Sequence, residues 1–290
     1  LSFISLFYHI NISFVKRLHN LRKPCIIVYM GLKICSLSSG SSGNCTYVSS
    51  DDTTVLIDTG ISISRVEKSL RVFSSPCDKV SVILTHTHSD HISGVPSLTA
   101  KYSAPVYAHY LSTDVKDKRD FDAKCLREFG DEDFCIGDLL ISPFRVSHDV
   151  PCVGFEIYNG GKKFSILTDL GHVTENTVKR ISDSDMVMIE ANHDEELLKN
   201  NAKYSYFLKK RILSQNGHLS NAACAATVVR LAKSGVKQIL LAHLSRENNY
   251  PELAFSAVSD ALAQNGIKEG KDVMIEVAAA QRMSGLYTIR

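Results

Sequence analysis

Three histidines and an aspartate stand within the seven residues 85–91, "THTHSDH", directly after the apolar run 80–84. A short apolar run with β-branched residues predicts a buried strand. Polar side chains at the end of such a strand are costly unless they find partners. The rest of the chain must therefore fold so that partners reach this point, and no other segment constrains the fold as strongly.

The spacing of these side chains is typical of a metal site. His86 and His88 are two residues apart, so they point the same way in extended backbone, and Asp90 and His91 follow at the turn into the next helix. Imidazole nitrogens with a carboxylate suit zinc, manganese or iron. The alternative is a histidine-rich surface loop without a metal.

Further candidate ligands follow other predicted strands. His148, Asp169 and His243 each come just after an apolar or alternating run, as do Asp58 and Glu190. Strand ends are where α/β folds place their chemistry. The set is large enough for two metal ions, with room for a hydroxide between them.

The order of predicted elements indicates an α/β protein with two sheets and helices on both outer faces. An "NGG" turn joins two of the strands in a hairpin. The predicted strands are 32–37, 45–48, 54–58, 80–84, 105–108, 139–146, 153–158, 163–168, 186–189, 238–242, 273–277 and 284–289, and the predicted helices are 64–73, 96–101, 195–214, 220–233 and 251–263.

Residues 1–29 differ in character from the rest. They mix apolar and basic residues without the charge order or cleavage site of a signal peptide. We interpret them as a non-native or disordered extension before Met30, with an organelle transit segment as the alternative. Residues 30–290 are expected to form one domain.

Charge and cysteine content limit the classes of protein. Five of the 33 Lys/Arg and none of the 31 Asp/Glu lie within residues 1–50, so the body is slightly acidic and not a strongly basic nucleic-acid binder. The eight cysteines form no CxxC pair, which favours reduced thiols in a cytoplasmic protein. The sequence contains no run of 18 apolar residues, so it predicts no membrane span.

Taken in order, these motifs resemble the metallo-β-lactamase fold over residues 30–290. The features are a strand-end Asp, HxHxDH, a lone His, an Asp after "SILT" and a His after "ILLA". The resemblance implies a four-layer αββα sandwich with two divalent metal ions (Zn, Mn or Fe). It implies that one metal is held by His86, His88 and His148 and the other by Asp90, His91 and His243, that Asp169 bridges them, and that Asp58 orients the HxHxDH loop.

The ligand types separate classes within this fold. Flavodiiron-type members have a Glu where His88 stands, and class B β-lactamases usually lack a bridging aspartate. The presence of Asp169 fits phosphodiesterases and nucleases, and also glyoxalase II-type thioesterases.

"EANHD" and "GHLSN" resemble the Glu and HxS motifs of tRNase Z and related nucleases. That resemblance implies that His218 protonates the leaving oxygen or binds phosphate, that Glu190 orients His218, and that both act with Asp90 in catalysis. Alternatively, His218 only caps the following helix. His193 is expected to support the site or to contact substrate.

The whole chain resembles the YycJ/WalJ group of bacterial metallo-β-lactamase-fold proteins, through segments such as "SLSSGSSGN", "LTHTHSDHISG", "TDLGH" and "LAHLSRENN". This implies a DNA exonuclease working from 5′ ends, in which a metal-bound hydroxide attacks the phosphodiester in line. A nucleic acid, DNA rather than RNA, would be the substrate, and homo-oligomer formation is left open.

Candidate substrate contacts are basic residues in the stretch 195–214, together with Asn44 in a Gly/Ser loop that could approach a phosphate. Lys209, Lys210 and Arg211 are the cations, and nearby aromatics could stack on bases. The simpler alternatives are a solvated helix face with its aromatics in the core, and a plain turn around Asn44.

Two other classes of function compete with a nuclease. One is a small-molecule hydrolase that acts on a thioester or a lactone, as glyoxalase II does. The other is a regulatory module whose metals are structural, which the intact ligand set disfavours.

Overall fold

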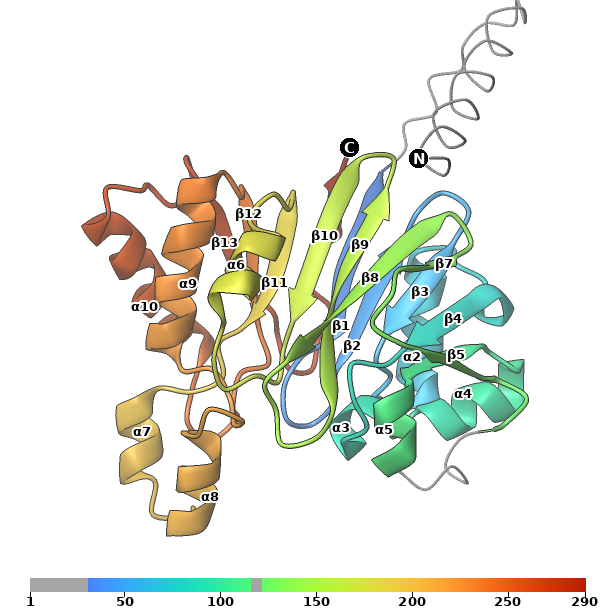
Figure 1. Cartoon of the computed structure of the whole chain (residues 1–290), viewed down its shortest axis with the longest axis horizontal. Coiled ribbons are helices and arrows are strands. Elements are labelled where there is room, and N and C mark those ends of the chain that lie inside the picture. The colour runs from blue at the N-terminus through green and yellow to red at the C-terminus, as the bar shows by residue number, and fades with distance from the viewer. Residues whose placement is uncertain (1–30, 116–121) are drawn as a thin grey trace, which may run out of the picture.

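The computed structural model describes residues 31–115 and 122–290, and within them the chain forms two seven-stranded sheets (Figure 1). The predicted extension 1–29 lies outside the described residues. The first sheet has the order β14-β1-β2-β3-β4-β5-β6. Its strands are β1 (Leu32–Ser38), β2 (Cys45–Ser49), β3 (Thr54–Ile57), β4 (Val80–Ile83), β5 (Val106–His109), β6 (Leu126–Phe129) and β14 (Tyr287–Ile289).

The second sheet has the order β13-β12-β11-β10-β9-β8-β7. Strands β10 to β13 are parallel, whereas β7 to β10 are antiparallel. Its members are β7 (Phe134–Ile136), β8 (Leu139–Val146), β9 (Cys152–Asn159), β10 (Lys162–Leu167), β11 (Met186–Glu190), β12 (Gln238–Ala242) and β13 (Met274–Val277).

Helices cover the outer face of each sheet, as Figure 1 shows. On the first sheet lie α2 (Ile63–Val72), α4 (Val95–Tyr102) and α5 (Tyr110–Val115). On the second lie α6 (Glu175–Ile181), α9 (Asn221–Ser234) and α10 (Pro251–Gln264). A short helix α3 (Ser89–Ile92) follows β4, and the pair α7 (Glu195–Asn200) and α8 (Tyr206–Ile212) projects beyond the sheets.

Three apolar clusters hold the four layers together. The inner faces of the two sheets pack through side chains such as Val48, Phe155 and Phe164, all of them buried. One outer cluster joins α2 and α4 to the first sheet, and the other joins α6, α9 and α10 to the second. The predicted four-layer αββα architecture is therefore confirmed.

The predicted helix 195–214 is wrong in one respect, because it is two short helices with a break at 201–205. Asn201 leaves the helical conformation, and its Oδ1 accepts a hydrogen bond from the Lys203 amide. Ser205 then caps α8, because its Oγ accepts from the Leu208 amide. The elements β6, β7, α5 and α6 were not predicted, since each is too short to carry a clear hydrophobic period.

No helix among the described residues is long and apolar enough to cross a membrane.

A buried ion network fixes α6 to the second sheet. Glu156 on β9 lies 2.7 Å from the Lys163 ammonium on β10 and also contacts the Arg180 guanidinium on α6. Burial would lower the pKa of Lys163, but the carboxylates of Asp183 and Glu156 raise it. Removing one partner of a buried pair leaves the other charge without compensation, which costs more than the pair contributes.

We expect Glu156→Ala to lower the free energy of unfolding by up to about 3 kcal/mol. The variant removes the buried carboxylate that pairs with the Lys163 ammonium, which keeps Asp183, and with the partly exposed Arg180 guanidinium. The exposed pair Lys33–Asp51 provides a control, and Asp51→Ala should cost under about 1 kcal/mol. Urea denaturation of both variants measures the difference. Equal losses in the two variants would contradict this account of the network.

Candidate metal centre

The candidate ligands lie where the carboxyl ends of strands from both sheets meet. A backbone hydrogen bond of 3.0 Å from the Val153 amide to the Thr85 carbonyl ties the two sheets together here. The sequence places polar side chains at or shortly after the ends of six strands, so that the sheets bring them to one place. Asp58 follows β3, His86 to His91 follow β4, His148 follows β8, Asp169 follows β10, Glu190 ends β11 and His243 follows β12.

Three of these residues have a left-handed backbone. Asp58, Asp169 and His243 have φ of 60°, 59° and 54°, and they are three of the five described non-glycine residues with positive φ. This conformation is unfavourable for a residue with a Cβ, and it persists where surrounding contacts hold it. The His243 amide, for example, donates to Ser39 Oγ at 2.7 Å. The sharp turns re-aim each side chain from the strand into the site.

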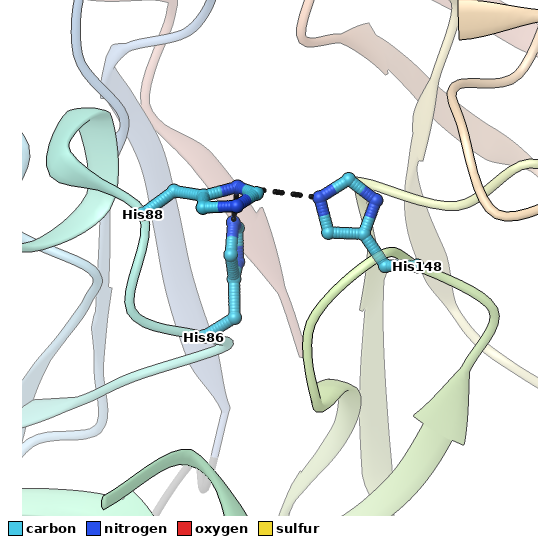
Figure 2. A group of neighbouring side chains, drawn as sticks. All are labelled: His86, His88 and His148. Atoms are coloured by element: carbon cyan, nitrogen blue, oxygen red, sulfur yellow. Dashed lines mark hydrogen bonds between the residues drawn. The ribbon is translucent and has the colours of Figure 1, made fainter. Parts of the chain in front are cut away.

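His86, His88 and His148 converge on one point (Figure 2). His86 Nε2 lies 3.0 Å from His88 Nδ1, which lies 3.3 Å from His148 Nε2. A tetrahedral zinc site with Zn–N bonds of about 2.0–2.1 Å places its nitrogens roughly 3.3–3.4 Å apart. Burial lowers the pKa of all three imidazoles, which keeps them neutral as metal ligands must be. These residues fit a divalent metal.

A second donor group adjoins the first. Asp90 Oδ2 lies 3.5 Å from His91 Nε2 and 3.6 Å from His243 Nε2. Asp169 reaches toward both groups, because its Oδ2 lies 3.4 Å from His91 Nε2 and its carboxylate also groups with His86. Asp169 Oδ2 and His243 Nε2 are buried without a hydrogen-bond partner among the described residues. Buried polar atoms of this kind are what a bound cation satisfies.

The carboxylates make this second group attractive to positive charge. Burial alone would lower the pKa of His91, but Asp169 and Asp58 raise it to about 10. Burial likewise opposes the charge on His243, and Asp169, Asp90 and Glu190 nevertheless raise its pKa well above the usual range. The field that favours protons on these imidazoles favours a metal cation equally.

Residues behind the candidate ligands fix the direction of each ring. Asp58 Oδ2 accepts from His91 Nδ1 at 2.7 Å and from Thr85 Oγ1 at 2.8 Å, and Thr85 Oγ1 accepts from His86 Nδ1. His148 Nδ1 donates to the Gly217 carbonyl at 3.2 Å. In each case the bond at Nδ1 leaves Nε2 to face the cluster, which is how metal-binding histidines are usually oriented.

Glu190 plays the same orienting role for His243 and His218. It is fully buried, and its Oε1 accepts from His243 Nδ1 at 2.6 Å and from His218 Nδ1 at 2.9 Å. Its Oε2 accepts from the amides of Leu170 and Leu219. All its acceptor positions are used, so Glu190 orients two imidazoles. The sequence predicted its contact with His218 and missed its contact with His243.

A cavity opens over the donor groups. Arg211 lines it and contacts Asp149, whose Oδ1 lies 3.4 Å from His88 Nε2 and 3.3 Å from His148 Nε2. The sequence did not single out Asp149, since an acid beside a histidine carries no signature spacing. The walls also include Asp90, Asp169, His218, His243, Asn192, Tyr204 and Leu208.

Three of the four predicted substrate contacts, Lys209, Lys210 and Asn44, are not among the residues that line the cavity. Lys209 Nζ donates to the Lys199 carbonyl. Asn44 is buried, and its Nδ2 donates to Asp90 Oδ2 and His91 Nε2, so it contacts candidate ligands and not the cavity. His193 is buried, with neither ring nitrogen bonded to a described residue, and burial lowers its pKa to about 4. The supporting role of His193 stays a prediction.

Comparison with known proteins identifies the family. Residues 53–244 match the Beta-lactamase superfamily domain. The chain belongs to this superfamily. It is 36% identical over 254 residues to a protein named exodeoxyribonuclease WalJ from Streptococcus pneumoniae, which covers 85% of this chain and 94% of that protein. It is 34% identical to exodeoxyribonuclease YycJ of Bacillus anthracis, over 83% of this chain and 93% of the relative.

The fold is shared more widely. The solved structure of the metallo-β-lactamase fold protein YhfI from Bacillus subtilis superposes with a TM-score of 0.66 at 16% identity, over 88% of this chain and 99% of that one. The predicted fold family and the predicted YycJ/WalJ type are both confirmed. This protein is a metal-dependent hydrolase of the superfamily.

Gly60 tests how tightly the HxHxDH loop is seated. A Cβ at this position would lie 1.6 Å from the Asp90 carbonyl oxygen and 2.8 Å from the Asn44 amide. We expect Gly60→Ala to displace the loop and to lower metal affinity at least about tenfold. Gly285→Ala, where a Cβ meets nothing within 4 Å, is the control. Metal titration by calorimetry that gives equal affinities would contradict this prediction.

Glu190→Gln should weaken metal binding about 10- to 100-fold, because an amide cannot accept all four hydrogen bonds and loses its hold on His243. Glu175→Gln, in an exposed ion pair with Arg230, is the matched control and should bind metal like the wild type. The same titration measures both variants. Unchanged affinity in Glu190→Gln would show that the ring of His243 needs no such support.

Proposed function

We propose that this protein is a binuclear metal-dependent phosphodiesterase that acts as a DNA exonuclease from 5′ ends. One observation carries the proposal: two adjoining donor groups share one cavity with a carboxylate-oriented histidine, His218. The names of the WalJ and YycJ relatives support DNA as the substrate. The direction of degradation rests on the resemblance to that group.

The residues that would hold the metals divide as the donor groups do. His86, His88 and His148 would hold one ion, Asp90, His91 and His243 the other, and Asp169 would contact both. A pair of bound divalent ions supplies Lewis acidity and a nucleophile at neutral pH for displacement at phosphorus. Mixed nitrogen and carboxylate donors suit Zn, Mn and Fe alike.

The chain itself would position the substrate and move one proton. His218 lines the cavity and is held at Nδ1 by Glu190. Burial would lower the pKa of His218, but Glu190 and Asp169 raise it, so the doubly protonated ring would give its Nε2 proton to the departing oxygen and be left neutral. Arg211 lines the same cavity as the donor groups, so it would contact a strand of nucleic acid bound there. The Arg211 guanidinium is partly neutralised by Asp149, so it would orient a phosphate more than attract it.

The free cysteines support the expected compartment. All seven cysteines of the described part of the chain are free thiols. The cytoplasmic location stays a prediction, and the formation of a homo-oligomer stays open.

A substrate panel tests the proposal. With Mn²⁺ present, the wild type should release nucleotides from the 5′ end of 3′-labelled duplex DNA, and chelation should abolish this. Asp90→Ala should reduce the rate at least about 100-fold, because it removes a ligand of one ion, whereas Asp51→Ala should retain full activity. A protein that cleaves only thioesters or lactones, or an Asp90→Ala variant with full activity, would overturn the proposal.

A further inference from the structure

Two aromatic rings stand exposed side by side on α8. The side chains of Tyr206 and Phe207 are 72% and 80% exposed, the highest values among the large apolar side chains of the described residues. Their ring centroids are 5.8 Å apart, with the planes at 72°. The aromatics of this stretch are therefore not core residues, contrary to the simpler reading of the sequence. Exposed apolar groups of this size mark an interaction surface.

An adjacent face of the same helix forms a wall of the cavity. Leu208, Arg211 and Ile212 line the cavity, so α8 has one face on the site and one in solvent. Helix residues four apart are neighbours on the surface, which places Phe207 beside Arg211 and Tyr206 beside Lys210. The aromatic pair thus continues the surface of the cavity outward along α8.

The cation next to these rings is available for a ligand. Lys210 is exposed, and its ammonium makes no hydrogen bond or ion pair within residues 31–115 and 122–290. By contrast, the exposed acids of α7 are paired with Lys199, and Glu247 is paired with Lys203. The exposed part of α8 therefore offers two rings and a free positive charge.

We propose that Tyr206, Phe207 and Lys210, here called the α8 platform, bind unpaired nucleotides of single-stranded DNA beside the catalytic cavity. Aromatic rings stack on bases of any sequence, and interleaved cations hold the backbone. Bases within a duplex are already stacked, so the platform would favour a frayed or single-stranded end. This inference rests on the proposed function and names the form of substrate that the site takes.

Direct binding tests the platform independently of catalysis. The probes are a fluorescein-labelled phosphorothioate oligothymidylate of about 12 nucleotides, within the range that single-strand binders cover, and an abasic phosphorothioate strand of equal length. Fluorescence anisotropy with the metal-loaded, full-length protein gives each Kd. Phe207→Ala and Tyr206→Ala should each weaken binding of the base-bearing strand about tenfold and leave the abasic strand unaffected.

Substitutions at Phe207 distinguish aromatic stacking on the bases from a nonspecific hydrophobic contact. Phe207→Tyr should bind like the wild type, whereas Phe207→Leu should lose as much affinity as Phe207→Ala. Lys210→Ala should reduce the slope of log affinity against log salt by about 0.7 for a single strand. Val72→Ala removes an exposed apolar side chain on α2 and should change nothing.

Three results would overturn the inference: unchanged affinity in Phe207→Ala, wild-type affinity in Phe207→Leu, or a wild-type dimer in sedimentation that Phe207→Ala dissociates. The last result would assign the surface to a second copy of the chain. Hydrolysis of bis(p-nitrophenyl) phosphate by the same samples separates the two proposals. If the wild type fails to cleave it, the proposed function fails, and the binding data still decide the platform.

Discussion

Three buried carboxylates, those of Asp58, Asp169 and Glu190, lie among the imidazoles of one cluster, and their charge governs the site. Ionised groups taken out of water require partners that return the lost solvation. Asp58 and Glu190 find theirs in ring nitrogens and backbone amides. Asp169 keeps a buried oxygen without a hydrogen bond among described residues, so a metal cation is the partner that its position calls for.

The two sheets position the strand ends so that the side chains of this cluster meet. Each candidate ligand follows a strand whose apolar core fixes its register, and left-handed turns at Asp58, Asp169 and His243 swing the side chains inward. The strain of these turns is held in place by contacts such as that of Ser39 with the His243 amide. A rigid scaffold with local strain at its strand ends is the usual arrangement of a site that must hold its geometry before the ligand arrives.

The sequence predicts more of the ligand set than of its surroundings. HxHxDH after a buried run, and single His or Asp residues after later strands, are local patterns, and the structure brings those side chains together. Three other contacts depend on loop packing. They are the contact of Glu190 with His243, that of Asn44 with Asp90, and that of Asp149 with His88 and Arg211. Such contacts join residues far apart in the chain and leave no periodic signal. The break at 201–205 was missed because capping by Ser205 overrode the helical composition around it.

Anomalous X-ray scattering at the absorption edges of zinc, manganese and iron tests the central claim most directly. On crystals of the metal-loaded protein, we predict two anomalous peaks, one enclosed by His86, His88 and His148 and the other by Asp90, His91 and His243, with Asp169 between them. A single peak, or peaks only outside this cluster, would contradict the account of a binuclear centre.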